Sequence, residues 1–188
     1  MRNQAIYLHE ILAQYQAPTG KQDNLSYRLA RRKAHNADAA LSSAYSAMLK
    51  EPSRGGSAQK EASGRFLICS HTLLNYISAI GAHRDELVLG HVDAGLLATA
   101  ETLQRQLDGL ALALERPQDA SSESLAKDLP PQIAGVQASD DADAMQRFLQ
   151  TQLQLALQLV PDLMEQVTQM TQTVRIRRPA VVQGSPLV

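Results

Sequence analysis

The 188-residue chain has little of what proteins use for covalent cross-linking or for binding through overall charge. It has one cysteine, Cys69, so no internal disulfide can form, and this fits a reducing compartment. Cys69 lies in an apolar run, RFLICSHTLL, where we expect a buried and unreactive thiol. The formal net charge of −1 provides no overall attraction to nucleic acid or to anionic lipid.

Long hydrophobic runs are also missing. No segment reaches the ~18 consecutive apolar residues that a membrane-spanning helix needs. The nearest, FLQTQLQLALQLVPDLM (148–164), is interrupted by four glutamines and a proline. The N-terminal stretch MRNQAIYLHEILAQY lacks the apolar region and the small-residue cleavage site of a signal peptide. We therefore expect a soluble chain, which can still be a soluble part of a membrane protein.

Aromatic residues are scarce, and the residues that dominate favour helices. Tryptophan is absent and phenylalanine occurs twice, whereas alanine, leucine and glutamine are abundant. No segment shows the period-2 alternation with β-branched residues that is typical of strands. The sequence predicts an all-α fold, an antiparallel helical bundle of four to five helices. We expect one domain over residues 1–174, with a loop at 116–139 and a flexible basic tail at 175–188.

Five helices are predicted, at about 3–16, 23–51, 61–83, 91–115 and 140–174. In the first, the apolar side is expected to consist of Ile6, Tyr7, Ile11, Leu12 and Tyr15. In the second, small residues form a seam: Ala30, Ala34, Ala37, Leu41, Ala44 and Met48. The third carries a stripe of Phe66, Leu73, Ile77 and Ile80. The fourth carries two heptad series, which predict bundle packing: Leu96, Leu103 and Leu110, and Ala100, Leu107 and Leu114. In the fifth, Pro161 predicts a kink or break, because proline has no amide donor.

Polar side chains follow one face of the second helix and one face of the third. The second helix carries, beside the alanine seam, Tyr27, Arg31, His35 and Asp38. The third carries His71, Asn75 and Ser78, with Arg84 and Asp85 at its end. Antiparallel pairing of the two helices would bring these stripes together as a network of arginine, histidine, aspartate and asparagine.

Three interpretations of this network are open. Buried polar groups without partners cost about 1–3 kcal/mol each, so the groups can simply satisfy one another and fix the helix register. Alternatively, Arg31, Arg32 and His35 form a binding face for an anion or a partner. Catalysis is the third interpretation and has the least support. The chain lacks a nucleophile motif, a glycine-rich phosphate loop and a convergent set of metal ligands. We predict no enzyme activity, no cofactor and no metal.

The basic stretch RLARRK is not typical of a nucleic-acid site. Its three consecutive cations, Arg31, Arg32 and Lys33, point in different directions on a helix, and no aromatic residues are interleaved to stack on bases. We therefore predict no nucleic-acid partner.

Two segments together resemble a known family. They are YRLARRKAHNADAALSSAYSAMLKEP (27–52) and GRFLICSHTLLNYISAIGAHRDEL (64–87). They are similar to the cytoplasmic C-terminal domain of FUSC-like inner-membrane proteins of the YccS/YhfK type, which are related to fusaric acid resistance proteins and aromatic acid exporters. The shared elements are RRxAHxxDAALS, followed by EP, and SHTLLxYISAxGAHR. The matching positions include Arg31, Arg32, His35, Asp38, His71 and His83. Asn75 departs from the pattern, which has serine there, and the family assigns no role to these residues.

The resemblance implies a soluble domain at the cytoplasmic face of a bacterial inner membrane, with an assembly or regulatory role in the export of aromatic acids or similar compounds. Its implied partner is the transmembrane region of the parent protein, and a homo-oligomer and a small anionic aromatic ligand are further expectations. Two alternatives stay open: a free-standing helical adaptor that binds a protein partner, and a metal-dependent bundle enzyme.

Overall fold

The structure, a computed structural model, describes residues 1–16, 24–51, 56–83, 93–117 and 144–177. These residues form six helices and no strand. The helices are α1 (Arg2–Gln16), α2 (Asn24–Lys50), α3 (Ser57–Ala82), α5 (Ala94–Glu115), α7 (Ala144–Gln158) and α8 (Val160–Arg177). The predicted all-α helical bundle is confirmed.

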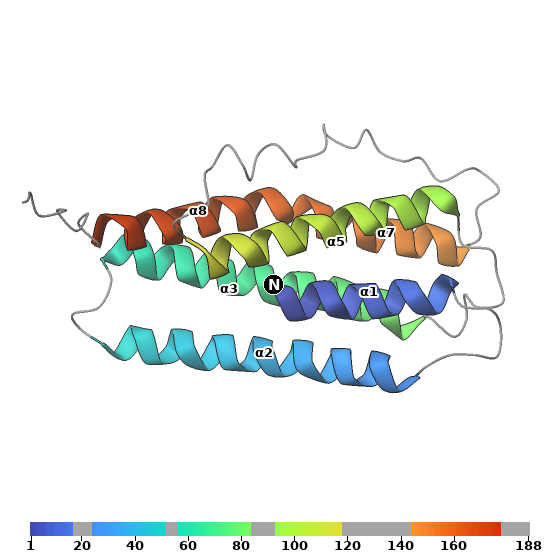
Figure 1. The fold of residues 1–188 in the computed structure, drawn as a ribbon, viewed down its shortest axis with the longest axis horizontal. Helices are drawn as coiled ribbons and strands as arrows, with labels where there is room; N and C mark the ends of the chain where they lie inside the picture. The colour runs from blue at the N-terminus through green and yellow to red at the C-terminus, as the bar shows by residue number, and fades with distance from the viewer. Residues whose placement is uncertain (17–23, 52–55, 84–92, 118–143, 178–188) are drawn as a thin grey trace, which may run out of the picture.

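The helices lie lengthwise beside one another (Figure 1). α3 contacts α1, α2, α7 and α8, while α5 lies against α1, α7 and α8. In Figure 1 the colours show that α2, α5 and α7–α8 run from right to left, whereas α1 and α3 run from left to right. The α1/α2 and α2/α3 neighbours therefore run in opposite directions, and α5 and α8 run in the same direction.

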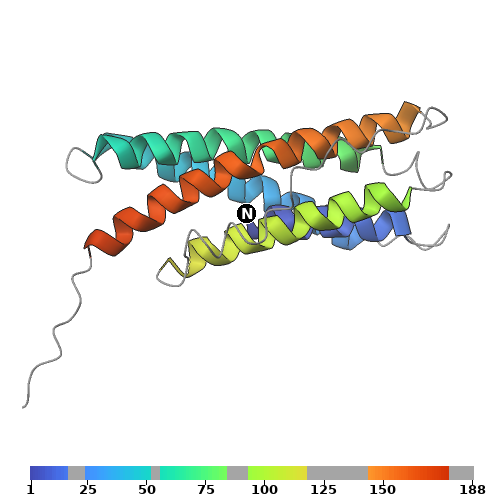
Figure 2. The ribbon, with the colours of Figure 1, turned by 90° about the horizontal axis from the view of Figure 1, so that it is seen from above.

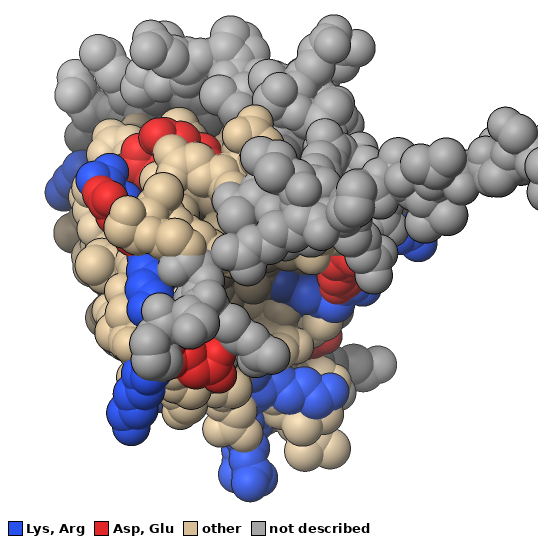
Figure 3. All heavy atoms as spheres, turned by 90° about the vertical axis from the view of Figure 1, so that its left-hand side faces the viewer, with Lys and Arg blue, Asp and Glu red and all other residues tan. Residues whose placement is uncertain are grey.

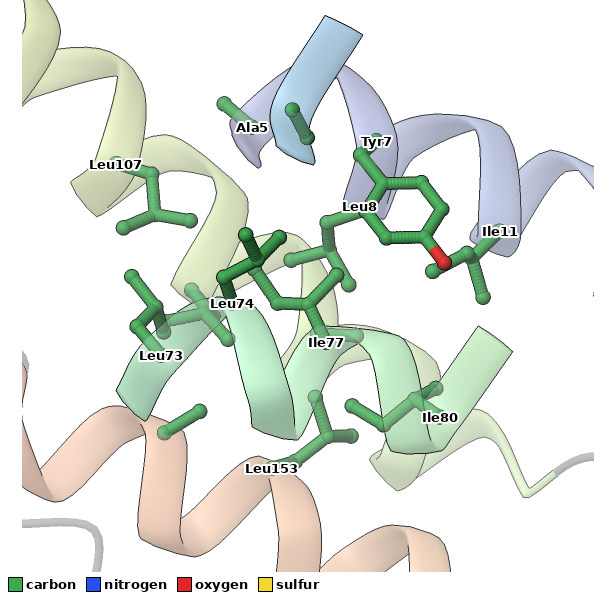
Figure 4. Packing of buried hydrophobic residues seen from close by; sticks show 14 of the residues in the cluster. Ala5, Tyr7, Leu8, Ile11, Leu73, Leu74, Ile77, Ile80, Leu107 and Leu153 are labelled. Atoms are coloured by element: carbon green, nitrogen blue, oxygen red, sulfur yellow. The ribbon is translucent and has the colours of Figure 1, made fainter. Parts of the chain in front are cut away.

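The core is built around one face of α3. Leu73, Leu74, Ile77 and Ile80 are at most 1% exposed. Figure 4 shows them facing side chains of α1, α5 and α7, which include Ala5, Tyr7, Leu8, Ile11, Leu107 and Leu153. The predicted stripe of α3 is confirmed as buried, and so are both heptad series of α5, except that Leu114 is half-buried. The 3.6-residue period of the sequence thus locates the core correctly on these two helices.

The predicted seam of α2 is correct only in its N-terminal half. Ala30 and Ala34 are buried, but Ala44 is exposed, and the remaining members are half-buried: Ala37, Leu41 and Met48. The cause is the length of the neighbouring helix. At ~1.5 Å per residue, the 15 residues of α1 extend along little more than half of the 27-residue α2. Beyond that point α2 loses one of the two helices that cover it.

Two details of α1 and α3 also differ from the prediction. Ile6 is 42% exposed and Leu8 is fully buried instead. One residue turns a helix by about 100°, so Ile6 points away from the face that carries Tyr7 and Ile11. α3 begins at Ser57 rather than near residue 61, because the amides of residues 59 and 60 bond to the carbonyl of Gly56 and start the first turn.

A break at Leu159, two residues before Pro161, separates α7 from α8, so the predicted kink or break is present just before the proline. The amide of Leu159 bonds back to Ala156 at 3.2 Å, and the amide of Leu163 bonds to Leu159 at 3.0 Å. Pro161 then lies in the first turn of α8, where a missing amide donor leaves no hydrogen bond unmade. Figure 2 shows the bend between the two helices.

Several predicted features lie outside the described residues: the helix start at Asp23, the helix ends at Arg84, Asp85 and His91, most of the 116–139 loop, the acidic cluster at 140–143, and residues 178–188 of the tail. α8 continues to Arg177, so residues 175–177, assigned to the tail, are helical. Among the described helices, none is both long enough and apolar enough to span a membrane.

Candidate functional site: a polar seam between α1, α2 and α3

Two buried tyrosines from different helices meet at the backbone of a third. Tyr7 of α1 is fully buried and Tyr27 of α2 is 3% exposed. The Tyr27 hydroxyl donates to the carbonyl of Gly81 in α3 at 3.2 Å, and the two tyrosine Oη atoms are 3.2 Å apart. Because Tyr27 uses its proton on Gly81, Tyr7 donates to Tyr27. A Cβ at Gly81 would lie 3.0 Å from both hydroxyls, so a glycine permits this close approach.

The Tyr7 phenol is held in its neutral form. Burial is the main cause that raises the pKa of Tyr7, and the hydrogen bond with Tyr27 raises it further. The positive charge of Arg31 and a hydrogen bond with Ser78 act in the opposite direction but do not reverse the shift. Tyr7 therefore acts as a hydrogen-bond donor and not as a base.

Two histidines extend this contact along α2 and α3. His35 Nε2 lies 3.4 Å from Ser78 Oγ, and its ring centroid is 6.4 Å from that of Tyr7. Further along, His71 Nδ1 lies 2.8 Å from Asp38 Oδ2. The His71 side chain is 59% exposed and that of Asp38 only 11%, so the histidine closes the outer side of a mostly buried carboxylate. The other oxygen of Asp38, Oδ1, is buried and has no hydrogen-bond partner among the described residues. We call this set of contacts the polar seam.

The structure leaves four of the predicted site residues outside these contacts. Arg31 and Arg32 are exposed, and neither forms an ion pair with a described residue. Asn75 is exposed as well and makes no hydrogen bond to the part of the chain that is described. His83 lies at the end of α3, where its ring packs edge-on against Phe148 with centroids 5.0 Å apart. His71 and Asp38 thus meet between α2 and α3, while the arginines and the asparagine do not join them.

Sequence reasoning missed the contribution of α1. Tyr7 was assigned to the apolar side, although a buried tyrosine hydroxyl usually needs a partner, and that rule could have pointed to the seam. Gln4 was missed too: its Nε2 donates to the carbonyl of Ser70 at 2.8 Å. Tyr15 donates to the carbonyl of Ile80 at 2.6 Å. These contacts attach α1 to α3 through side chains that carry no motif.

Among the described residues, no group of three or more His, Cys, Asp or Glu side chains comes together as a metal site would require. Cys69 is half-buried rather than fully buried, and burial, followed by the negative charge of Asp162, raises the pKa of its thiol. Chemically, the arrangement consists of neutral tyrosine donors and an Asp–His pair, which together hold three helices in register.

Comparisons with known proteins give two relatives. The chain is 34% identical over 173 residues to a protein named inner membrane protein YccS, from Escherichia coli K12. This match covers 88% of the chain and 22% of that protein. The chain is also 44% identical over 87 residues to an uncharacterized protein of Haemophilus influenzae. This second match covers 46% of the chain and 12% of that protein. The chain therefore spans less than a quarter of the length of these relatives. No protein-family profile matches it, and no solved structure does.

Proposed function

This chain is a YccS/FUSC-like relative of inner-membrane proteins, and from that premise we propose that it acts as a soluble cytoplasmic domain of a transporter-like membrane protein. Its role would be the assembly or regulation of the transporter, in the export of aromatic acids or similar compounds. Its main partner would be the transmembrane region of the same protein, with a homo-oligomer as a further expectation. The proposal assigns no catalytic step and no cofactor to the chain.

The observation that carries the proposal is the similarity to YccS, which extends over most of the chain. The distribution of charge supports a position in water beside the membrane. Leucine, isoleucine and alanine side chains pack on one another inside the bundle, while Arg28, Arg31, Arg32 and Lys33 lie on the outside of α2. Charged side chains facing lipid hydrocarbon are costly, so this outer surface suits water or a headgroup layer.

The C-terminal half of α2 supports an assembly role. Ala44 is exposed, Met48 is half-buried and Leu49 is 49% exposed. Small and apolar residues on a helix face that has lost one neighbour allow another helix to approach closely. We propose that a helix of the parent protein, or of a second copy, packs there.

Thiol labelling of the full-length protein tests the cytoplasmic position. Cys69 would first be replaced by serine, and Ser43→Cys would then place one thiol on the exposed face of α2. We expect a membrane-impermeant maleimide to label this thiol in inverted inner-membrane vesicles and not in intact spheroplasts. The reverse pattern would place the chain on the other side of the membrane and contradict the proposal.

A matched pair of leucine substitutions in the full-length protein tests the role. Leu73→Ala removes a fully buried side chain of α3, and Leu112→Ala removes a side chain that is 49% exposed on α5. If the domain supports assembly or regulation, Leu73→Ala reduces the native oligomer and the export of an aromatic carboxylate, while Leu112→Ala leaves both unchanged. Normal assembly and export after deletion of the whole domain would refute the role.

The expected small ligand has its own test. Arg31 is exposed and forms no ion pair with a described residue, so its guanidinium group is open to a carboxylate. Calorimetric titration with aromatic carboxylates should give heat with the wild-type chain and less with Arg31→Ala. No heat with the wild type argues against this ligand, and bound metal in the purified chain would instead favour the metal-enzyme alternative.

A further inference from the structure

The N-terminal half of α2 combines exposed leucines with exposed cations. Leu25 is 72% exposed and Leu29 is 49% exposed, and they lie one turn apart on the outer side of α2. The cations on the same stretch are Arg28, Arg31, Arg32 and Lys33, and all four are exposed. No acidic residue occurs between positions 24 and 37. Of the four cations, Arg28 and Arg32 lie beside the two leucines, and we call Leu25, Arg28, Leu29 and Arg32 the α2 basic patch.

Helix geometry gathers the patch on the outside of the bundle. Residues three and four apart are neighbours on a helix surface. Leu25 therefore adjoins Arg28 and Leu29, and Arg32 adjoins the latter two. The opposite face of the same turns carries Ala30 and Ala34, which are buried against the bundle. Helices that lie in a membrane interface bind through basic residues together with apolar residues such as leucine, and the outer side of α2 carries both.

None of the patch cations forms an ion pair with a described residue. Two other exposed arginines do, since Arg2 lies 2.7 Å from Glu115 and Arg65 lies 2.7 Å from Glu61, whereas Arg105 and Arg116 form none with a described residue. Like charges at i,i+4, such as Arg28 and Arg32, destabilise a helix slightly, so the patch is not explained by the stability of α2. Figure 3 looks at the end of the bundle where α2 ends, away from the patch, and there basic and acidic side chains are interspersed.

We propose that the α2 basic patch docks on anionic phospholipid headgroups, with Leu25 and Leu29 entering the headgroup layer. The proposal rests on the proposed function in one respect, because that function places the chain beside a bilayer. Charge complementarity selects anionic over zwitterionic lipid, since each basic residue near an anionic surface strengthens binding about fivefold. Two leucines at the centre favour lipid over nucleic acid, for which stacking aromatic residues would be expected.

Vesicle co-sedimentation of the purified 188-residue chain tests the proposal. The vesicles would be phosphatidylcholine alone, or phosphatidylcholine mixed with phosphatidylglycerol. We expect the wild type to bind only the mixed vesicles, and more weakly as salt rises, because exposed charges are screened. The double variant Arg28→Gln/Arg32→Gln should bind about 25-fold more weakly, which is the product of two fivefold losses. Leu25→Ser/Leu29→Ser should weaken binding but keep its dependence on salt.

The matched control is Lys50→Gln/Arg116→Gln. It removes the same charge from two exposed positions at the other end of the bundle, so binding should stay at the wild-type level. Far-UV circular dichroism checks that every variant keeps its helix content.

Equal binding to both kinds of vesicle, or equal loss of binding in the control and in Arg28→Gln/Arg32→Gln, would overturn the proposal. Dimerisation without vesicles that Leu25→Ser/Leu29→Ser abolishes would assign the patch to a second copy and overturn it too. The thiol-labelling result is independent, so a cytoplasmic position can hold while lipid binding fails.

Discussion

One methyl group added at Gly81 tests the packing of the polar seam directly. The new Cβ would lie 3.0 Å from Tyr7 Oη, Tyr27 Oη and Ile11 Cδ1, which is closer than ordinary contact. All three neighbours are buried, so none can swing into solvent. Overpacking of a core costs about 1–3 kcal/mol, and displacing the Tyr27 hydroxyl from the carbonyl it bonds costs about 1 kcal/mol more. Against these costs, alanine stabilises the helix by about 1 kcal/mol relative to glycine, because its helix propensity is higher. We therefore expect Gly81→Ala to lower the free energy of unfolding by about 1–3 kcal/mol.

Urea denaturation followed by far-UV circular dichroism measures this change, and two other helical glycines serve as controls. A Cβ at Gly109 meets nothing within 4 Å, so Gly109→Ala should stabilise the chain by about 0.5–1 kcal/mol. A Cβ at Gly64 would lie 2.5 Å from Tyr45 Oη. That tyrosine is only half-buried and can move its hydroxyl end, so Gly64→Ala should be close to neutral. If Gly81→Ala stabilised the chain as much as Gly109→Ala, the three helices would not meet as closely as described.

Three further predictions concern the isolated chain. Leu73→Ala should lower the free energy of unfolding by about 2–5 kcal/mol in urea titrations, and Leu112→Ala should change it by less than about 0.5 kcal/mol; equal effects would contradict the assigned core. Because the pKa of Tyr7 is raised in the folded state, the neutral phenol stabilises the fold fully below the unfolded pKa of about 10, and this contribution is lost as pH rises toward the folded pKa. The free energy of unfolding should thus fall above about pH 10, and it should fall less steeply in Tyr7→Phe than in the wild type. The same decline in both proteins would refute the burial of this phenol. A double-mutant cycle with Asp38→Ala and His71→Ala should give a coupling energy below about 1 kcal/mol, because the histidine is 59% exposed, and a value well above that would mean that the pair is shielded from water.

The parts of the fold that were predictable from sequence are those that depend on one helix alone. Leu103, Leu107 and Leu110 repeat with the period of a helix face, and all three are buried. The break just before Pro161 follows from the chemistry of one residue. Such features need no knowledge of the neighbouring helices, so local periodicity was enough to place them.

The seam of α2 and the arginines of the site depend on neighbours, and there the predictions were incomplete. Ala44 continues the spacing of Ala30 and Ala34, yet it is exposed because α1 does not reach it. Arg31 shares a helix face with Asp38 by spacing, but it has no ion-pair partner among the described residues. Which polar side chains meet was decided by tertiary packing, and spacing along one helix does not contain that information.

The polar seam itself was only half predictable, for a chemical reason. Histidine and aspartate are polar throughout, so Asp38 and His71 could be selected from the sequence as candidates for polar contacts. Tyr7 is amphipathic, and its ring belongs to the core while its hydroxyl belongs to the seam. Gly81 has no side chain, so the sequence gives no sign of a contact there. Its importance becomes visible only in the structure, where a Cβ at this position would lie 3.0 Å from the hydroxyls of Tyr7 and Tyr27.

The two halves of α2 present different chemistry to separate partners. The basic patch is centred near Leu29 and the apolar face near Ala44, which places them about 22 Å apart at ~1.5 Å per residue. This exceeds the screening length of about 8 Å at physiological ionic strength, so charge changes at the patch should not disturb a helix packed on the apolar face. Tyr27, Ala30 and Ala34 hold the first half of α2 rigidly against α1 and α3. A rigid helix that contacts lipid at one end and protein at the other would fix the orientation of the domain relative to the membrane. When variants in the two halves are combined, the loss of lipid binding and the loss of assembly should each equal the sum of the free-energy effects of the single variants.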